Sequence, residues 1–256
     1  MNWFDDYEIR ARILPAIIVF LPVMVPIFLT IYGNITPIVS FLFSGIVFAA
    51  LLYPLSFIVR KPGSKLEKTL WEQWDGPPST RVMRWRDNTF GIALKTELHK
   101  AVWDYCGIAL SNLDEEQNDP READRKIGDA FSQVKHLVYH DDPKGMWRKF
   151  NAEYGFNRNL LGCKYLWIAL SVVGVIICGF CWHFTGDSAY AVGSFINLAI
   201  LIAAAILTQC VLPKTVKDPA EHYATSVWQT FLVVMKKLDK MEARSDLQET
   251  SRSPGA

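Results

Sequence analysis

Residues 13–59 read ILPAIIVFLPVMVPIFLTIYGNITPIVSFLFSGIVFAALLYPLSFIV and contain no charged side chain. The stretch divides at Gly33-Asn34 into an apolar segment at 13–32 and a second one at 38–59. Because about 20 apolar residues are enough to cross a bilayer as a helix, each segment can form one crossing. The stretch therefore predicts a membrane-spanning helical hairpin.

A second apolar stretch lies between Lys164 and Lys214, where Asp187 is the only charged residue. The sequence divides it into segments 165–184 and 190–212, so the chain predicts an all-α polytopic membrane protein with four spans. The expected parts are 1–59 with the first hairpin, 60–163 as a cytoplasmic helical domain, 164–212 with the second hairpin, 213–243 as a cytoplasmic amphipathic helix, and 244–256 as a disordered tail.

Composition excludes several classes of protein as the main identity. Half of the 256 residues are hydrophobic and 21% are charged, and the two kinds are segregated along the chain. This pattern argues against a soluble enzyme, a secreted disulfide scaffold and a DNA-reading domain. Asp5, Asp6 and Glu8 precede the first apolar segment, so we expect a retained span instead of a cleaved signal peptide.

The basic residues predict the orientation of the spans. Of the 27 Lys and Arg residues, two precede the first hairpin, 18 lie in 60–164 and seven follow the second hairpin. Neither hairpin loop contains one. Because Lys and Arg resist translocation, both termini and the central segment are expected in the cytoplasm.

Prolines and the absence of charge characterise the spans. Pro15, Pro22 and Pro26 fall in the first span, where each removes a backbone donor; they are either a hinge or the ordinary proline content of membrane helices. No Asp, Glu, Lys or Arg lies inside any predicted span, which argues against a proton-coupled transporter.

The segment between the hairpins has helix punctuation and no alternating strand pattern. Ser64-Lys-Leu-Glu67 is a capping box that predicts a helix starting there and running to about Trp74. Asp119-Pro120 and Asp142-Pro143 each predict a capped helix start with a first-turn proline.

An arginine-rich run, Ser79-Thr-Arg-Val-Met-Arg-Trp-Arg86, is the most unusual polar feature. Three hypotheses remain open for it: a phosphate or nucleotide ligand, anionic lipid headgroups, or ion pairs with the 16 acidic residues of the same segment. Direct nucleic-acid binding is not expected, because that segment is almost neutral. The candidate binding residues are Arg81, Arg84, Trp85 and Arg86.

A heptad-like seam follows the last span. It predicts self-association or docking on the central helices, and the alternative is an amphipathic helix lying on the membrane. The seam residues are Ala224, Trp228, Phe231, Met235 and Leu238.

Catalytic and metal-binding patterns are weak, and we expect no cofactor, no metal and no enzymatic activity. Cys178-Gly-Phe-Cys181 lies near the end of an apolar span, and His136 with His140 lacks a third ligand. A lipid-modifying acyltransferase is kept as an alternative, because His99 and His136 are each followed five residues later by Asp.

Two stretches, Trp74-Asp-Gly-Pro-Pro-Ser-Thr-Arg81 to Arg86-Asp-Asn88 and Tyr154-Gly-Phe-Asn-Arg-Asn-Leu160, resemble segments of poorly characterised bacterial inner-membrane proteins. The layout of four spans with a helical insert is similar to membrane components of bacterial anti-phage defence systems. The resemblance implies a multi-pass protein of the bacterial inner membrane.

These observations lead to one main hypothesis. The chain is a homo-oligomeric membrane protein whose cytoplasmic helices receive a signal or a protein partner, and whose kinked spans then perturb or conduct across the membrane. The alternative is a non-conducting scaffold that assembles with another protein.

Overall fold

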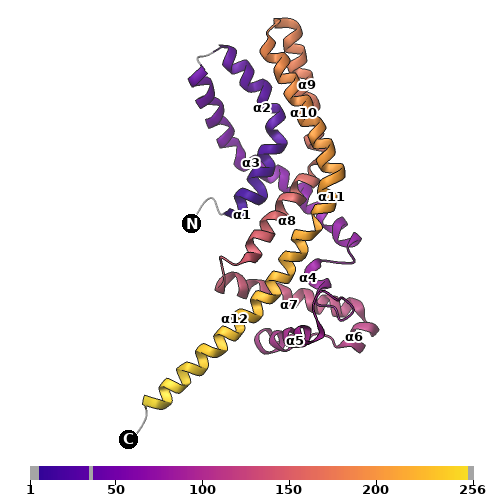
Figure 1. Cartoon of the computed structure of the whole chain (residues 1–256), viewed down its shortest axis with the longest axis vertical. Coiled ribbons are helices and arrows are strands. Elements are labelled where there is room, and N and C mark those ends of the chain that lie inside the picture. The colour runs from indigo at the N-terminus through magenta and orange to yellow at the C-terminus, as the bar shows by residue number, and fades with distance from the viewer. Residues whose placement is uncertain (1–5, 35–36, 253–256) are drawn as a thin grey trace. The chain divides into compact units, whose positions relative to one another are not determined.

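The computed structural model describes the backbone of residues 6–34 and 37–252, and the side chains of residues 7–31, 46, 50–241 and 244. Every regular element in this part of the chain is a helix, so the all-helical prediction is confirmed (Figure 1). The elements are α1 (Asp6–Glu8), the π-helical turn η1 (Ile9–Ile13), α2 (Leu14–Asn34), α3 (Pro37–Gln73), α4 (Pro78–Arg81), α5 (Ile92–Cys106), α6 (Leu113–Asn118), α7 (Pro120–Asp141), α8 (Met146–Gly162), α9 (Lys164–Thr185), α10 (Ser188–Ile206), the π-helical turn η2 (Leu207–Val211), α11 (Leu212–Thr215) and α12 (Lys217–Arg252).

The chain divides into two compact units. Unit 1 contains Met1–Leu70 and Asn151–Pro219, and unit 2 contains Trp71–Phe150 and Ala220–Ala256. This division differs from the expected parts, since most of α8 belongs with the apolar helices and most of α12 belongs with the central segment. Each of the three passages between the units lies within a helix, namely α3, α8 and α12.

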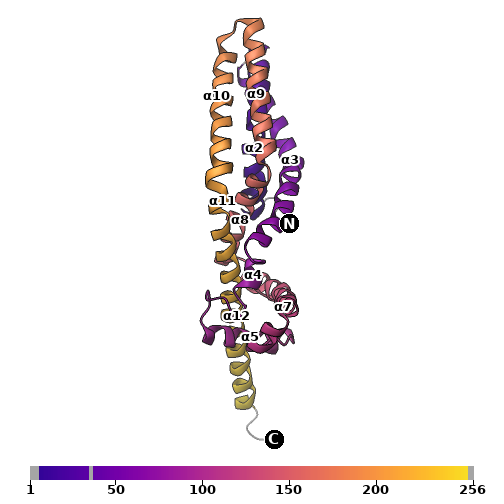
Figure 2. The same ribbon diagram turned by 90° about the vertical axis from the view of Figure 1, so that its right-hand side faces the viewer.

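Three apolar helical runs dominate unit 1. Ile9–Ile31, Lys164–Thr185 and the run that begins at Ser188 are long and apolar enough to cross a membrane. Helix α2 packs against α9 and α10, and α9 lies beside α10 along its length (Figure 2). Only 22–28% of the residues in these apolar windows are buried, so their outer faces are exposed.

The second predicted span falls on α3. Side chains 38–45 and 47–49 lie outside the described residues, and this segment is not among the three runs found. The span at 38–59, and with it the total of four spans, therefore stays a prediction.

Helix α3 also corrects one prediction. A new helix starting at Ser64 is wrong, because α3 continues without a break through Pro54, Pro62 and Ser64 to Gln73. In a continuous helix, the carbonyl groups of the preceding turn accept hydrogen bonds from the backbone N–H groups that a capping box would otherwise satisfy. A capping sequence permits a helix start and does not by itself require one.

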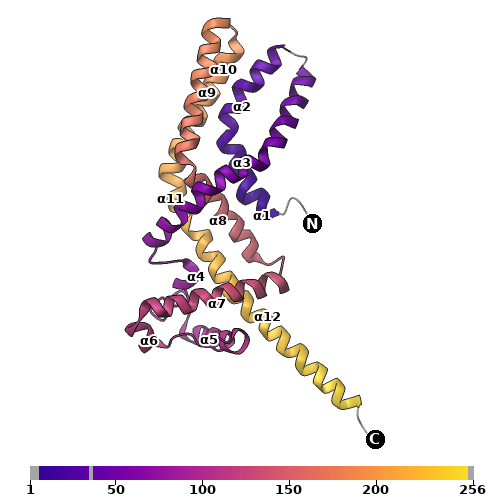
Figure 3. The same cartoon turned by 180° about the vertical axis from the view of Figure 1, so that it is seen from behind.

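Helices α5, α7 and α12 enclose the core of unit 2 (Figure 3). Helix α7 begins as predicted, with the Asp119 carboxylate accepting a 3.0 Å bond from the Glu122 amide. Helix α8 starts at Met146, four residues after Asp142. Its entry is fixed instead by the Trp147 indole, which donates to the Asp142 carbonyl at 3.0 Å.

Helix α12 extends beyond its predicted end. A disordered tail is expected from residue 244, whereas the helix continues to Arg252, and residues 253–256 lie outside the described part. Adding residues to an existing helix avoids the cost of nucleation, and this polar segment contains good helix formers such as Leu247, Gln248 and Glu249.

Candidate functional site

Arg84 lies at the centre of the arginine-rich segment in unit 2 and is almost fully buried. Its Nε and Nη2 donate to the two carboxylate oxygens of Asp124 at 2.7 Å, and its Nη1 donates to the carbonyl and carboxylate of Asp75 at 2.6 and 2.7 Å. Burial alone would lower the pKa of Arg84, but the two carboxylates raise it above its ordinary value. Arg84 therefore makes ion pairs within the protein, as one of the three hypotheses for this segment predicts.

The other candidate binding residues belong to the same segment, and only Arg86 shares a partner with Arg84. Arg81 pairs with Glu221. The Trp85 indole donates to the Ser111 carbonyl at 2.9 Å. Arg86 is 52% exposed and reaches Asp75 at 3.2 Å, so it is the most accessible of the three arginines.

A further polar residue, Lys95 of α5, contacts this loop and was not predicted from the sequence. Lys95 is 1% exposed, and its ammonium donates to the carbonyls of Arg84 and Asp87. Burial lowers the pKa of Lys95, although Asp87 and Glu116 oppose the shift. Its position on the helix face of Leu98 is the signal that sequence analysis could have used, because charged residues on apolar faces usually have buried partners.

His99 packs its ring on Trp85, with 4.7 Å between ring centroids. Burial lowers the pKa of His99 from 6.5 to about 4, despite a hydrogen bond to the Met83 backbone. The unfolded chain therefore binds a proton below pH 6.5 that folded His99 refuses, so stability falls as pH drops from 6.5 towards 4.

We expect this difference in pKa to cost about 2 kcal/mol at pH 5. Thermal unfolding of the full chain, followed by tryptophan fluorescence at pH 7.5 and pH 5, measures the loss. His99→Phe keeps a ring against Trp85 and removes the titration, so its melting temperature should fall less between the two pH values. An equal fall in both proteins would contradict the assignment.

The seam of α12 lies in the core of unit 2. Ala224, Trp228, Phe231 and Met235 are buried there, and Leu238 is partly buried against the same cluster. The Trp228 indole donates to the Ser79 carbonyl at 2.9 Å. Docking on the central helices is thus the arrangement that the structure has for this helix.

In unit 1, Pro15 changes the hydrogen bonding of the helical turn that precedes it. Because proline has no N–H, the Ala11 carbonyl loses its helical donor, and the Leu14 amide donates to the Ile9 carbonyl in the π-helical turn η1. The Asn159 side chain of α8 donates to the Ala11 carbonyl at 2.6 Å, and both residues are 1% exposed. Asn159 therefore satisfies the carbonyl that Pro15 leaves open.

The end of the last apolar run repeats this backbone pattern. In η2 the Leu212 amide donates to the Leu207 carbonyl, and Pro213 follows directly. Both π-helical turns end two residues before a proline, and each lies at the boundary between apolar and polar sequence. A π-helical turn accommodates the missing donor without ending the helix.

Pro22 and Pro26 lie inside α2, where it packs against α9 and α10. Pro26 cannot donate to the Pro22 carbonyl, and a Cβ on Gly174 would lie 2.7 Å from that oxygen. Asn197 is fully buried nearby, and its Nδ2 lies 3.8 Å from Cys178 Sγ. Gly174 thus lets α9 approach α2 closely at the carbonyl that has lost its hydrogen bond.

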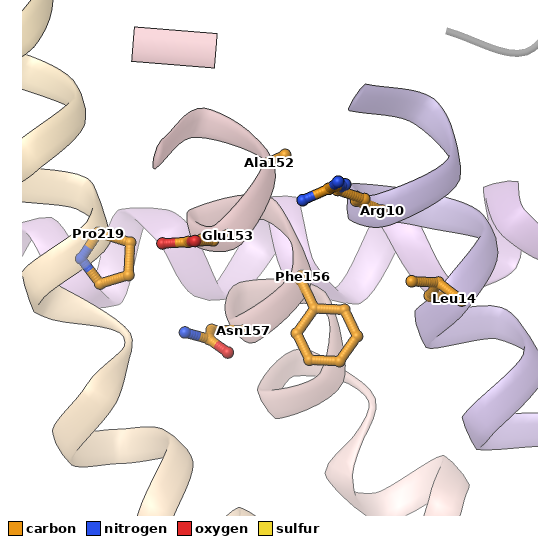
Figure 4. A pocket seen from close by; sticks show the side chains of 7 residues that line it. All are labelled: Arg10, Leu14, Ala152, Glu153, Phe156, Asn157 and Pro219. Carbon is orange, nitrogen blue, oxygen red and sulfur yellow. The ribbon is translucent and has the colours of Figure 1, made fainter. Parts of the chain in front are cut away.

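A cavity of about 250 Å³ lies at the polar end of unit 1 (Figure 4). Its wall combines the cationic Arg10 and the anionic Glu153 with apolar side chains such as Phe156. The residues that line it are Arg10, Leu14, Ala152, Glu153, Phe156, Asn157 and Pro219.

Comparison with known proteins finds no matching family model, curated protein or solved structure. The function must therefore be argued from the geometry of the chain itself. In the described part, no group of three or more His, Cys, Asp or Glu residues is placed to hold a metal ion. His140, one of the two histidines considered as ligands, is exposed and contacts Asp141 at 2.9 Å.

Proposed function

We propose that the chain is a four-span protein of a bacterial inner membrane whose cytoplasmic helical unit receives a signal or a protein partner. The bent spans then perturb or conduct across the membrane, in a homo-oligomer. Both termini and unit 2 lie in the cytoplasm, and the hairpin loops lie outside. The proposal includes a role in anti-phage defence, in line with the resemblance in layout.

Membrane insertion is supported by the exposed apolar faces of unit 1. Side chains such as Ile176, Phe180 and Phe195 are 61–69% exposed on α9 and α10. Water would solvate this surface poorly, whereas acyl chains would cover it. The predicted second span completes an even number of crossings, which returns the chain to the cytoplasm.

Signal transfer is the step that distinguishes an effector from a scaffold, and one observation carries it. The chain passes between the two units three times, each time inside a helix and never through a loop. A helix transmits rotation or translation along its axis, whereas a flexible linker does not. A change in unit 2 therefore has a helical backbone route into unit 1 along α12, which begins at Lys217, four residues after Pro213.

Inducible clustering of the full chain in bacterial cells tests the proposal. A dimerisation domain fused after Ala256 would replace the unknown signal, and a potential-sensitive dye would report the membrane. We expect depolarisation within minutes of clustering, and a weaker response when Pro15, Pro22 and Pro26 are all replaced by alanine. Reporter fusions at residues 34 and 186 and after residue 256 would check the four-span topology independently.

A scaffold gives a different result in the same cells. If the chain inserts with the expected topology and clusters, but the membrane potential stays constant, the effector proposal is wrong. The second candidate, a non-conducting assembly partner, would then be favoured. It is also supported by the exposed apolar side chains on α9 and α10, which other membrane helices could cover.

A further inference from the structure

We propose that α3 binds the phosphate-bearing headgroup of an anionic lipid at the cytoplasmic face of the membrane. The residues are Arg60, Lys61, Lys65 and Lys68, here called the basic stripe. The inference rests on the proposed insertion of unit 1 in a membrane. It concerns a part of the chain that the arginine-rich segment of unit 2 does not include.

The basic stripe follows one face of α3 directly after its apolar part. Lys61, Lys65 and Lys68 are separated by four and three residues, a spacing that places side chains on the same side of a helix. Arg60 directly precedes Lys61 and lines the same surface. All four side chains are exposed. The surface around them is shallow and open, and the residues that line it all belong to α3: Phe57, Arg60, Lys61, Ser64, Lys65 and Lys68.

Within the described part of the chain, the cations of the basic stripe have no protein counterion. Among the side chains that the structure describes, none of the four makes an ion pair or a hydrogen bond. Two acids of α3 lie near the stripe, Glu67 and Glu72. Glu67 is already used by Arg158 at 2.5 Å and by the Tyr154 hydroxyl at 3.0 Å. Four like charges at this spacing repel one another, so an anion bound between them relieves an unfavourable arrangement.

The opposite face of α3 fixes the orientation of the basic stripe. Val59, Gly63 and Leu70 are buried. A Cβ on Gly63 would lie 2.1 Å from the Asn159 Oδ1 of α8, which shows how closely the two helices approach. The stripe therefore points away from the packed side of unit 1 and is open to a ligand.

An amphiphile fits this surface better than a free anion does. On the apolar side of this surface, Tyr53 and Phe57 form an edge-to-face pair with ring centroids 4.9 Å apart. Their side chains are 58% and 46% exposed. Exposed aromatic side chains next to cations are typical of the membrane interface. The aromatic pair can contact acyl chains while the cations bind the phosphate.

Native mass spectrometry of the full chain from nanodiscs tests the inference. The nanodiscs contain phosphatidylcholine with one-fifth cardiolipin, and the spectrum counts the lipids that remain bound. One variant carries Arg60→Gln, Lys61→Gln, Lys65→Gln and Lys68→Gln. The matched control carries Lys100→Gln, Arg121→Gln, Lys144→Gln and Lys237→Gln, which removes the same charge from exposed positions of unit 2.

We expect bound cardiolipin in the wild type and the control, and at least about tenfold less in the stripe variant, since each cation near an anionic surface contributes roughly fivefold. Binding should weaken as salt is raised from 50 to 500 mM, because the cations are exposed. Equal retention by all three proteins, or equal loss in the control and the stripe variant, would overturn the inference.

Two further measurements separate the possible failures. If inorganic pyrophosphate binds the detergent-solubilised wild type but not the stripe variant, while nanodiscs show no preference for cardiolipin, the ligand is a soluble anion and the lipid assignment is wrong. If the protein does not sediment with membranes after carbonate washing, the proposed function itself fails. Insertion without lipid selectivity overturns the inference alone.

Discussion

Replacing Arg84 with alanine is expected to destabilise unit 2 by about 3 kcal/mol. The substitution removes four hydrogen bonds and leaves the carboxylates of Asp124 and Asp75 without the guanidinium that connects them. The Asp124 side chain is 34% exposed, so water can solvate part of its carboxylate and offset part of the lost stability. Thermal unfolding of the full chain in detergent should show a decrease of about 10 °C in the melting temperature of unit 2.

Arg86→Ala is the matched control for this prediction. Arg86 is two residues away, shares Asp75 as a partner and is 52% exposed, so its removal should change stability by less than about 0.5 kcal/mol. Arg84→Lys should recover only part of the stability, because one ammonium cannot bridge both acids as a planar guanidinium does.

A stable, folded Arg84→Ala protein would have a different meaning. It would show that the ion pairs do not hold the loop at 75–87, and it would return Arg84 to the ligand-binding hypothesis. The same variant tested in the clustering assay then separates the two roles, since a folded protein without a response points to sensing.

Local sequence properties were enough to predict part of this architecture. The three apolar runs follow from the exclusion of charge over about 20 residues, and the start of α7 follows from Asp119-Pro120. Both signals lie within the segment that they describe. The basic stripe could also have been found, because Lys61, Lys65 and Lys68 have a helical spacing and Arg60 joins them to an apolar segment.

The partners of the candidate residues could not be predicted, since they depend on tertiary packing. Arg84 meets Asp124 across 40 residues and Arg81 meets Glu221 across 140, and many other acids were available to each. The Asn159 contact with Ala11 likewise joins residues 148 positions apart. The continuity of α3 through Ser64 and the length of α12 were missed for another reason: a capping sequence or a polar composition allows a helix to start or stop but does not oblige it to.

Gly162→Ala is expected to destabilise unit 1 by about 3 kcal/mol, the other large effect. A Cβ at this position would lie 2.6 Å from the backbone N of Gly63 and 2.8 Å from the carbonyl carbon of Pro62. Neither atom can move without displacing α3, so α8 must shift away from it. Thermal unfolding in detergent measures the loss, and hydrogen exchange should show faster opening of α8.

Displacement of α8 would also affect the bonds that depend on its position. Asn159 would lose its 2.6 Å bond to the Ala11 carbonyl, and Arg158 would lose its ion pair with Glu67. The carbonyl that Pro15 leaves without a donor would then be buried and unsatisfied, which adds to the cost of overpacking. The first apolar helix should therefore be affected even though the substitution is in α8.

The same substitution at Gly128 gives the opposite expectation. Gly128 lies inside α7, and a Cβ there would have no other atom within 4 Å. Alanine is the better helix former, so Gly128→Ala should stabilise unit 2 by about 0.5–1 kcal/mol. The same change from glycine to alanine thus distinguishes the effect of close helix packing on stability from that of intrinsic helix propensity. If both substitutions changed the free energy of unfolding in the same direction, the glycine-mediated contact between α3 and α8 would be contradicted.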